Sequence, residues 1–197
     1  INDIRCRKIN MKTKFILHGG FTPHEKQEDD AFFKEILKDV SEKAKVLLVY
    51  FASEIGRIPT YKEGDVAQFN KNKSERTLMF DVANERSFLK QVDWADIIYL
   101  HGGKTLKLLD VLKKFSNLKE LFEGKTIAGD SAGANVLGKI FYSPSVNDIF
   151  EGLGLIPVKI IPHYSEKYKD KADELNKYNK DLELLLLREY QYKVFQK

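Results

Sequence analysis

Cysteine is nearly absent from this sequence. The 197 residues contain one cysteine, Cys6, so no disulfide can form within the chain. The sequence also has no run approaching the roughly 18 apolar residues of a membrane-spanning helix, and no hydrophobic signal segment stands out. We therefore expect a protein that works in a reducing, cytoplasmic setting and has no membrane partner.

A strong excess of charge of one sign is missing as well. The chain has 33 basic and 29 acidic residues, which give a net charge of +4, and the basic residues are spread along its length. This pattern is typical of a solvated surface, so we expect no nucleic-acid partner. The few histidines and the single cysteine do not fall at metal-ligand spacing with carboxylates, so we predict no metal site and no cofactor.

What is present is the composition of an ordinary globular domain. The chain is 43% apolar and 31% charged, and its length suits one α/β domain with a substantial core. Residues 1–10 lack clear periodicity and are followed by Met11. We interpret 1–10 as an upstream or vector-derived extension and 11–197 as a single domain.

Short apolar runs alternate with amphipathic stretches along the chain. The runs predict strands at 12–17, 46–51, 76–82, 96–100, 126–128, 158–161, 182–187 and 190–195. The periodic stretches predict helices at 29–44, 61–73, 85–92, 106–115, 118–122, 132–140 and 166–180, whereas 142–154 is typical of a loop. This alternation predicts an α/β fold with a doubly wound, mostly parallel sheet and flanking helices. In such sheets, functional groups collect at the carboxyl ends of the strands.

The sequence centres on a Gly-x-Ser-x-Gly pattern between a short strand and a helix. Gly129, Ser131 and Gly133 follow the apolar run 126–128, as in a nucleophile elbow, a sharp strand-to-helix turn with serine at its tip. Glycines, which have no Cβ, suit such a strained turn. Ser131 is therefore a candidate nucleophile and the N–H of Ala132 a candidate oxyanion donor, although a glycine-flanked helix cap fits the same residues.

A serine nucleophile needs a base, and the base needs a group that orients it. Among the four histidines, His163 is the best candidate base, because the end of strand 158–161 is predicted at the same sheet edge as Ser131. The orienting acid has two candidates, Glu189 after the run 182–187 and Asp148 in the loop before His163. Either carboxylate could equally be an ordinary surface group.

A His-Gly-Gly turn follows the predicted strand 96–100. Its glycines, Gly102 and Gly103, offer backbone N–H groups beside the strand end. Together with the N–H of Ala132, either glycine could complete an oxyanion hole. The alternative is a plain glycine turn before a helix.

Three segments resemble one known family. They are Tyr-Leu-His-Gly-Gly-Lys-Thr at 99–105, Gly-Asp-Ser-Ala-Gly-Ala-Asn at 129–135 and Ile-Pro-His-Tyr at 161–164. On these segments the chain resembles the peptidase E family of serine peptidases, the S51 group with aspartyl dipeptidase and cyanophycinase. The resemblance covers essentially residues 11–197.

The resemblance implies both a fold and an activity. It implies a flavodoxin-like sheet similar to that of class I glutamine amidotransferases, with Ser131 as nucleophile and His163 as base. It implies an oxyanion hole from Gly102 and Ala132, and an acid at Glu189, which we favour, or at Asp148. The implied substrates are short peptides, typically dipeptides with N-terminal aspartate. One departure is Lys104, because the family usually has asparagine or aspartate after the paired glycines.

Two other functions fit parts of the same pattern. Gly-Asp-Ser-Ala-Gly and His-Gly-Gly both occur in α/β-hydrolase esterases, but that fold places its histidine near the C-terminus, after the acid. The second alternative is a catalytically inactive binding protein on the same fold, which Lys104 keeps open. A homodimer also stays an open alternative, because the sequence does not define the oligomeric state.

Overall fold

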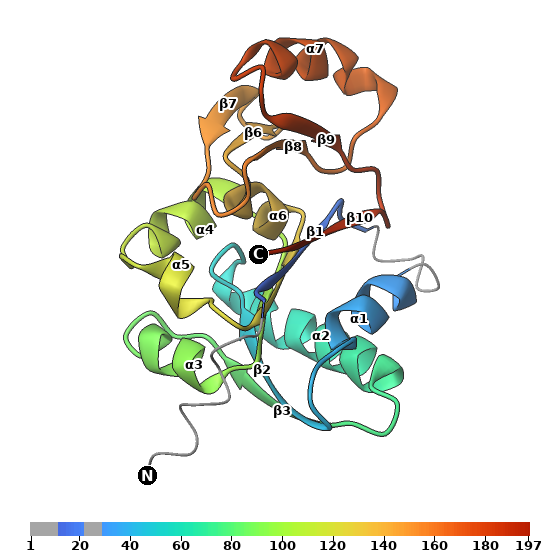
Figure 1. The fold of residues 1–197 in the computed structure, drawn as a ribbon, viewed down its shortest axis with the longest axis vertical. Coiled ribbons are helices and arrows are strands. Elements are labelled where there is room, and N and C mark those ends of the chain that lie inside the picture. Colours follow the sequence, from blue (N-terminus) through green and yellow to red (C-terminus); the bar gives the residue numbers. More distant parts are fainter. Residues whose placement is uncertain (1–11, 22–28) are drawn as a thin grey trace.

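A computed structural model describes residues 12–21 and 29–197. The predictions about residues 1–10, Met11 and Cys6 lie outside the described residues, as does His24. Within the described part of the chain, the strands form a six-stranded sheet and a four-stranded sheet, and Figure 1 shows the smaller sheet stacked against one end of the larger.

The larger sheet has the strand order β10-β1-β5-β4-β2-β3. Its strands are β1 (Lys14–His18), β2 (Lys43–Val49), β3 (Thr77–Val82), β4 (Ile97–Leu100), β5 (Thr126–Asp130) and β10 (Tyr192–Gln196). All neighbours run parallel except β10, which pairs antiparallel with β1. The order places β1, β5 and β4 side by side, so their carboxyl ends meet at one edge.

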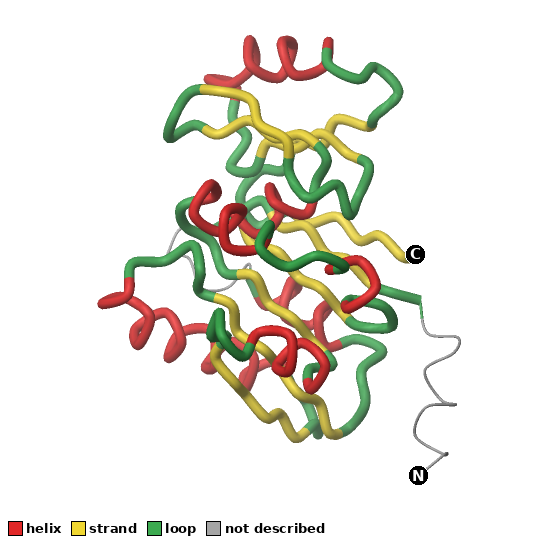
Figure 2. The backbone as a smooth tube through the Cα atoms, turned by 90° about the vertical axis from the view of Figure 1, so that its left-hand side faces the viewer, coloured by secondary structure: helices red, strands yellow, loops and turns green. Residues whose placement is uncertain are grey.

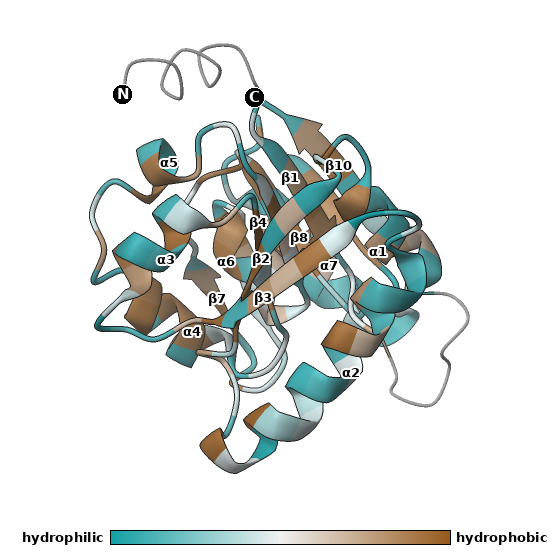
Figure 3. Ribbon diagram, turned by 90° about the horizontal axis from the view of Figure 1, so that it is seen from below, coloured by the Kyte–Doolittle hydropathy of each residue, from teal (hydrophilic) through white to brown (hydrophobic). Residues whose placement is uncertain are grey.

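Helices cover both faces of this sheet. On one face lie α1 (Asp30–Leu37) and α2 (Ile58–Asn72), and on the other lie α3 (Phe88–Trp94), α4 (Thr105–Leu112), α5 (Leu118–Leu121) and α6 (Ala132–Leu137). Successive strand residues face opposite sides, so Leu48 and Tyr99 pack under α1 and α2 while Leu47 and Ile98 pack under α3 and α4. Figure 3 shows hydrophobic strands at the centre and a hydrophilic outer surface on α2. The predicted doubly wound α/β sheet is confirmed.

The smaller sheet has the order β7-β6-β8-β9. It contains β6 (Ile140–Ser143), β7 (Asp148–Glu151), β8 (Val158–Ile161) and β9 (Glu183–Leu186), and α7 (Lys169–Lys177) covers its outer face. Phe141 and Ile160 extend the core of the larger sheet, whereas Tyr142 and Ile161 pack against α7. Figure 2 shows this sheet lying between α7 and the main body.

The structure corrects several sequence predictions. The helix predicted at 132–140 ends at Leu137, and β6 begins at Ile140. Residues 142–154 are not a loop, because β6 and β7 form an antiparallel hairpin there. The helix predicted at 29–44 ends at Leu37, where Lys38 becomes extended and Asp39 takes φ 66°, and β2 already begins at Lys43. The strand 158–161 does not belong to the sheet of Ser131, since β8 lies in the smaller sheet.

Candidate active site

Ser131 sits where β5 turns sharply into α6. Its backbone has φ 48° and ψ −98°, outside the regions that a non-glycine residue normally occupies, and its N–H donates to the carbonyl of His18 at 3.1 Å. A Cβ on Gly129 would lie 2.6 Å from the carbonyl oxygen of Gly133, and a Cβ on Gly133 would lie 2.8 Å from Cβ of Leu100. Both glycines are therefore needed for the turn to close, which is the geometry of a nucleophile elbow.

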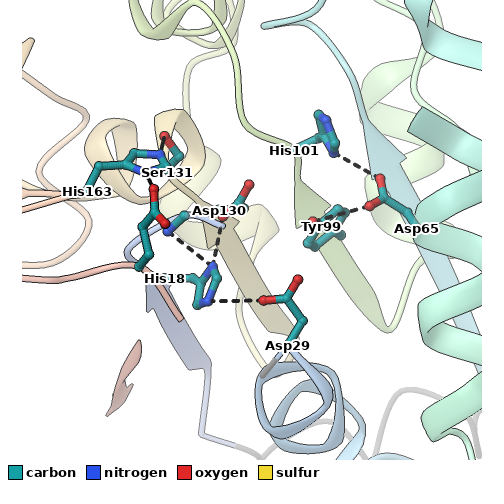
Figure 4. Close-up of polar contacts among 10 residues, drawn as sticks. His18, Asp29, Asp65, Tyr99, His101, Asp130, Ser131 and His163 are labelled. Atoms are coloured by element: carbon teal, nitrogen blue, oxygen red, sulfur yellow. Dashed lines mark hydrogen bonds and ion pairs between the residues drawn. The ribbon is translucent and has the colours of Figure 1, made fainter. Parts of the chain in front are cut away.

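His163 follows β8, and its imidazole lies against Ser131. The distance from His163 Nε2 to Ser131 Oγ is 3.0 Å, although the two residues come from different sheets (Figure 4). The backbone of His163 has φ 50°, and its N–H donates to the carbonyl of Gly19 at 2.7 Å. A Cβ on Gly20 would overlap the imidazole ring, so this glycine provides the space that the ring occupies.

Glu189 lies on the other side of the same imidazole. Its Oε1 is 3.2 Å from His163 Nδ1, and the chain that carries it links β9 to β10. Backbone bonds fix this link at both ends, from Tyr164 N–H to Leu187 O at 3.0 Å and from Tyr190 N–H to Gly20 O at 2.9 Å. Serine, imidazole and carboxylate thus form one line of polar contacts.

Asp148 is not brought to His163. It begins β7, the strand at the far side of the smaller sheet from β9, and its side chain is exposed. Its Oδ1 accepts a hydrogen bond from the N–H of Ile149 at 2.7 Å. Of the two carboxylates predicted from the sequence, Glu189 is the one beside the imidazole.

Gly102, Gly103 and Ala132 lie close to Ser131. A Cβ on Gly102 would be 3.5 Å from Cβ of Ser131, so this glycine packs directly against the elbow. Gly103 has φ 137° and approaches the carbonyl of Ala52 so closely that a Cβ would be 2.7 Å from its oxygen. Among the described residues, no acceptor bonds the backbone N–H of Gly102, Gly103 or Ala132. These amides are free to donate to a substrate oxygen.

His101 anchors the turn that carries the two glycines. Its Nδ1 is 2.9 Å from Asp65 Oδ2 on α2, and the same oxygen accepts from Tyr50 OH at 2.9 Å. Burial lowers the pKa of His101, but the hydrogen bond and charge of Asp65 outweigh it, so the pKa is raised. The side chain of His101 therefore holds the turn against α2, and the next residue, Gly102, lies beside Ser131.

His18 and its two carboxylate neighbours form a buried polar cluster beside the candidate site that sequence reasoning missed. His18 ends β1 and is fully buried, with Nδ1 2.8 Å from Asp130 Oδ1 and Nε2 4.0 Å from Asp29 Oδ1 (Figure 4). The sequence offered one signal, a repeated His-Gly-Gly tripeptide. Its two copies, at 18–20 and 101–103, follow β1 and β4, which both border β5 in the larger sheet. The partners of His18 could not be found from its sequence neighbours, because Asp130 is 112 residues away.

A cavity of about 670 Å³ opens beside Ser131. Ser131, His163, Gly102 and Gly103 line one end of it, and α2 forms a wall with Tyr61, Gly64 and Gln68. Lys104 does not line this cavity; it borders a smaller hollow of about 380 Å³ on the other side of the glycines. There its Nζ pairs with Glu54 Oε1 at 2.5 Å. Ser131 therefore borders the larger cavity and not the smaller hollow.

Residues 12–21 and 29–197 contain neither a metal-binding cluster nor a membrane-spanning helix. No group of three or more histidine, cysteine, aspartate or glutamate side chains in these ranges could hold a metal ion. No helix of this part of the chain is both long enough and apolar enough to cross a membrane.

Comparison with known proteins gives similar relatives in sequence and in structure. Over 143 residues the chain is 28% identical to peptidase E of Shewanella oneidensis, an alignment that covers 68% of this chain and 58% of that protein. The chain thus spans less than two thirds of that relative.

Two crystal structures share the fold. A peptidase from an acI-B1 actinobacterium superposes with a TM-score of 0.68 at 24% identity, over 94% of this chain and 84% of that one. A protein of Listeria monocytogenes EGD-e superposes with a TM-score of 0.65 at 17% identity, over 94% and 98%.

The model of peptidase family S51 matches residues 15–196, which is nearly the whole described chain. The match includes the elbow, both glycine turns and the segments that carry His163 and Glu189. It confirms the family resemblance found in the sequence. The chain therefore belongs to peptidase family S51.

Proposed function

We propose that the protein is a serine peptidase that hydrolyses short peptides, with Ser131 as nucleophile, His163 as general base and Glu189 as the orienting acid. The observation that carries this proposal is the 3.0 Å contact between His163 Nε2 and Ser131 Oγ on a strained turn. Membership of family S51 and the name of the Shewanella relative, peptidase E, support peptide hydrolysis.

The mechanism follows from the order of these groups. Ser131 Oγ attacks the scissile carbonyl carbon while His163 Nε2 takes the hydroxyl proton. His163 then donates that proton to the leaving amine as the peptide C–N bond breaks, leaving an acyl-serine. Water then attacks the acyl carbon while His163 Nε2 takes one of its protons. His163 returns that proton to Ser131 Oγ as the acyl C–Oγ bond breaks, which releases the acid and restores the serine.

Glu189 and the free amides have separate tasks in this scheme. Glu189 accepts a hydrogen bond from Nδ1–H of His163, which keeps the lone pair of Nε2 directed at the serine and stabilises the imidazolium that forms. The N–H groups of Ala132 and of Gly102 or Gly103 donate to the oxyanion of the tetrahedral intermediate. Each such donor lowers the barrier by about 3 kcal/mol.

Two alternatives from the sequence are less well supported. An α/β-hydrolase esterase would carry its acid between serine and histidine in the chain, whereas Glu189 comes after His163. An inactive binding protein would not need a strained serine in contact with an imidazole that itself contacts a carboxylate.

The test is a hydrolysis panel read by mass spectrometry. Dipeptides with varied first residue, N-terminal aspartate included, are compared with p-nitrophenyl esters, using wild-type protein and Ser131→Ala. We expect dipeptide cleavage that falls by about 10⁶-fold in Ser131→Ala. Ester cleavage without any dipeptide cleavage would favour the esterase, and turnover of neither class by the wild type would favour the binding protein.

A further inference from the structure

The cavity beside Ser131 carries more negative than positive charge. Three aspartates line it, Asp29, Asp65 and Asp130, and one lysine, Lys71. Lys71 is already paired, because its Nζ lies 2.6 Å from Oδ2 of Asp30. The lysine therefore does not offset the aspartates.

Both carboxylate oxygens of Asp65 already have hydrogen-bond partners. Its Oδ2 accepts from Tyr50 OH and from His101, and its Oδ1 accepts from Tyr99 OH. A buried carboxylate with these three donors needs nothing more from a ligand. The carboxylate oxygens that lack donors therefore belong to the other two aspartates.

In Asp130, the residue before Ser131, the two carboxylate oxygens have different surroundings. Oδ1 is held by His18, whereas Oδ2 lies 2.8 Å from the point where a Cβ on Gly102 would stand. Cβ of Ser131 is 3.5 Å from that same point, and both Asp130 and Ser131 line the cavity, so Oδ2 lies close to the serine. Among the described residues, no hydrogen-bond donor reaches Oδ2 of Asp130. An unbalanced carboxylate here would oppose a developing oxyanion unless a cation is bound nearby.

Asp29 is buried, and one of its carboxylate oxygens has no hydrogen-bond partner among the described residues. Its side chain is 5% exposed, it lines the cavity, and the unpartnered oxygen is Oδ1. The imidazole of His18, which is charged only if protonated, has its Nε2 4.0 Å from this oxygen, too far for a hydrogen bond. One imidazole cannot neutralise both Asp29 and Asp130, so the pair keeps a net negative charge when both are ionised. A buried, unpartnered carboxylate oxygen at a cavity wall is an acceptor that awaits a donor.

We propose that this cavity binds the cationic side chain, arginine or lysine, of the residue whose carbonyl carbon Ser131 attacks. The proposal rests on the proposed peptidase function for the position of that residue. Asp29 and Asp130 accept hydrogen bonds from the guanidinium or ammonium group, and Phe33 and Tyr61, which also line the cavity, pack against its apolar stem. An acidic side chain in the same place would meet these carboxylates and be excluded.

The test compares arginine with citrulline, its uncharged equivalent of the same shape. Wild-type protein is given Arg-Leu, citrulline-Leu, Lys-Leu, Ala-Leu and Asp-Leu, and kcat/KM is measured for each. We expect Arg-Leu to exceed citrulline-Leu by about tenfold or more, and Asp-Leu to be the poorest of the five. All five dipeptides carry the same free terminal ammonium, so the comparison reports on the side chain alone.

Asp29→Asn tests the residue, and Asp110→Asn is its matched control. Asp110 is an exposed aspartate on α4 outside the cavity. We expect Asp29→Asn to reduce the ratio of kcat/KM for Arg-Leu to that for citrulline-Leu by about tenfold, and Asp110→Asn to leave the ratio unchanged. Thermal unfolding of both variants checks that they are folded.

Binding separates this inference from the proposed function. Calorimetry on Ser131→Ala gives the Kd of Arg-Leu and of citrulline-Leu without turnover. Tighter binding of Arg-Leu supports the inference even if the wild type hydrolyses no dipeptide, in which case the peptidase proposal alone fails. Equal or weaker binding of Arg-Leu, or hydrolysis with a preference for Asp-Leu, overturns the inference while peptidase activity stands.

Discussion

Two His-Gly-Gly turns flank Ser131, and the same three residues do different work in each. Residues 18–20 follow β1, and residues 101–103 follow β4. In the first turn, carbonyl oxygens accept from Ser131 and His163, and Gly20 leaves space for the imidazole. In the second turn, the glycine N–H groups beside the serine have no acceptor within residues 12–21 and 29–197. The first turn positions the reacting side chains, and the second can bind the substrate oxygen.

The two histidines of these turns also differ in the further contacts of the aspartates that they bind. Each holds an aspartate through Nδ1, His18 with Asp130 at 2.8 Å and His101 with Asp65 at 2.9 Å. The pair on α2 is completed by Tyr50, whereas the pair at β5 leaves carboxylate oxygens facing the cavity. A tripeptide pattern therefore predicts a turn, but its function depends on what the fold places opposite it.

The largest expected effect comes from breaking the first turn. Gly20→Ala forces a methyl group into the imidazole of His163 at a backbone φ of 98°, so the ring must leave Ser131. We expect kcat/KM to fall by about 1,000-fold. This loss is larger than that expected for a slightly misplaced base and smaller than that expected when the base is removed. The control is Gly56→Ala, where a Cβ meets nothing within 4 Å. A loss of less than about tenfold would contradict the role of this turn.

Breaking the second turn should act on the oxyanion instead. Gly103→Ala places a methyl group against the carbonyl of Ala52 at a φ of 137°, which displaces the neighbouring amides. We expect kcat to fall by about 100-fold, because one oxyanion donor is lost. KM should change little, since ground-state binding does not need this donor. A change confined to KM would show that the turn binds substrate and does not stabilise the transition state.

The third prediction concerns Glu189, the proposed acid next to His163. Glu189→Gln removes the charge that stabilises the imidazolium, and we expect kcat to fall by roughly 30-fold. The effect is smaller than for a buried acid, because the Glu189 side chain is 42% exposed and water can replace part of the interaction. Asp148→Asn is the matched control and should keep wild-type kcat. The reverse result would make Asp148 the orienting acid.

The smallest expected effect is on stability, and it concerns Asp29, the second carboxylate near His18. Burial raises the pKa of Asp29 from 3.8 to about 6, although the charge of His18 lowers it. Because the folded protein holds this proton more tightly than the unfolded chain, ionised Asp29 destabilises the fold above about pH 6 and not below pH 3.8.

Asp29→Asn should remove that destabilisation. The carboxyl faces His18, Asp130, Asp30 and Asp65, and only the first of these can carry positive charge. We expect the free energy of unfolding by urea near pH 7.5 to rise by about 1 kcal/mol, and the gain to vanish near pH 4. A loss of stability near pH 7.5 would mean that the ionised carboxylate stabilises the fold through His18.

Much of this arrangement could be predicted from the sequence. The elbow was predictable because Gly129 and Gly133 exclude a Cβ for a local steric reason that any reader of the pattern can apply. Most strands of the larger sheet were predictable because they are buried on both faces and so consist of continuous apolar runs.

The rest depended on contacts between distant segments. The hairpin β6–β7 was missed because half of it is exposed and its turn residues resemble a loop. The proximity of His163 to Ser131 was predicted for the wrong reason, since the imidazole comes from the smaller sheet and is fixed by Gly19 and Gly20. The cluster around His18 had no local signal beyond a repeated tripeptide.

The most direct measurement is the reaction of the protein with a fluorophosphonate probe, followed by intact-mass and peptide mapping. The probe reacts only with a serine whose proton a nearby base removes and whose oxyanion is stabilised. The account predicts a single adduct on Ser131 in the wild type, and none in Ser131→Ala or His163→Ala. An adduct on another residue, or equal labelling of Ser131→Ala, would contradict it.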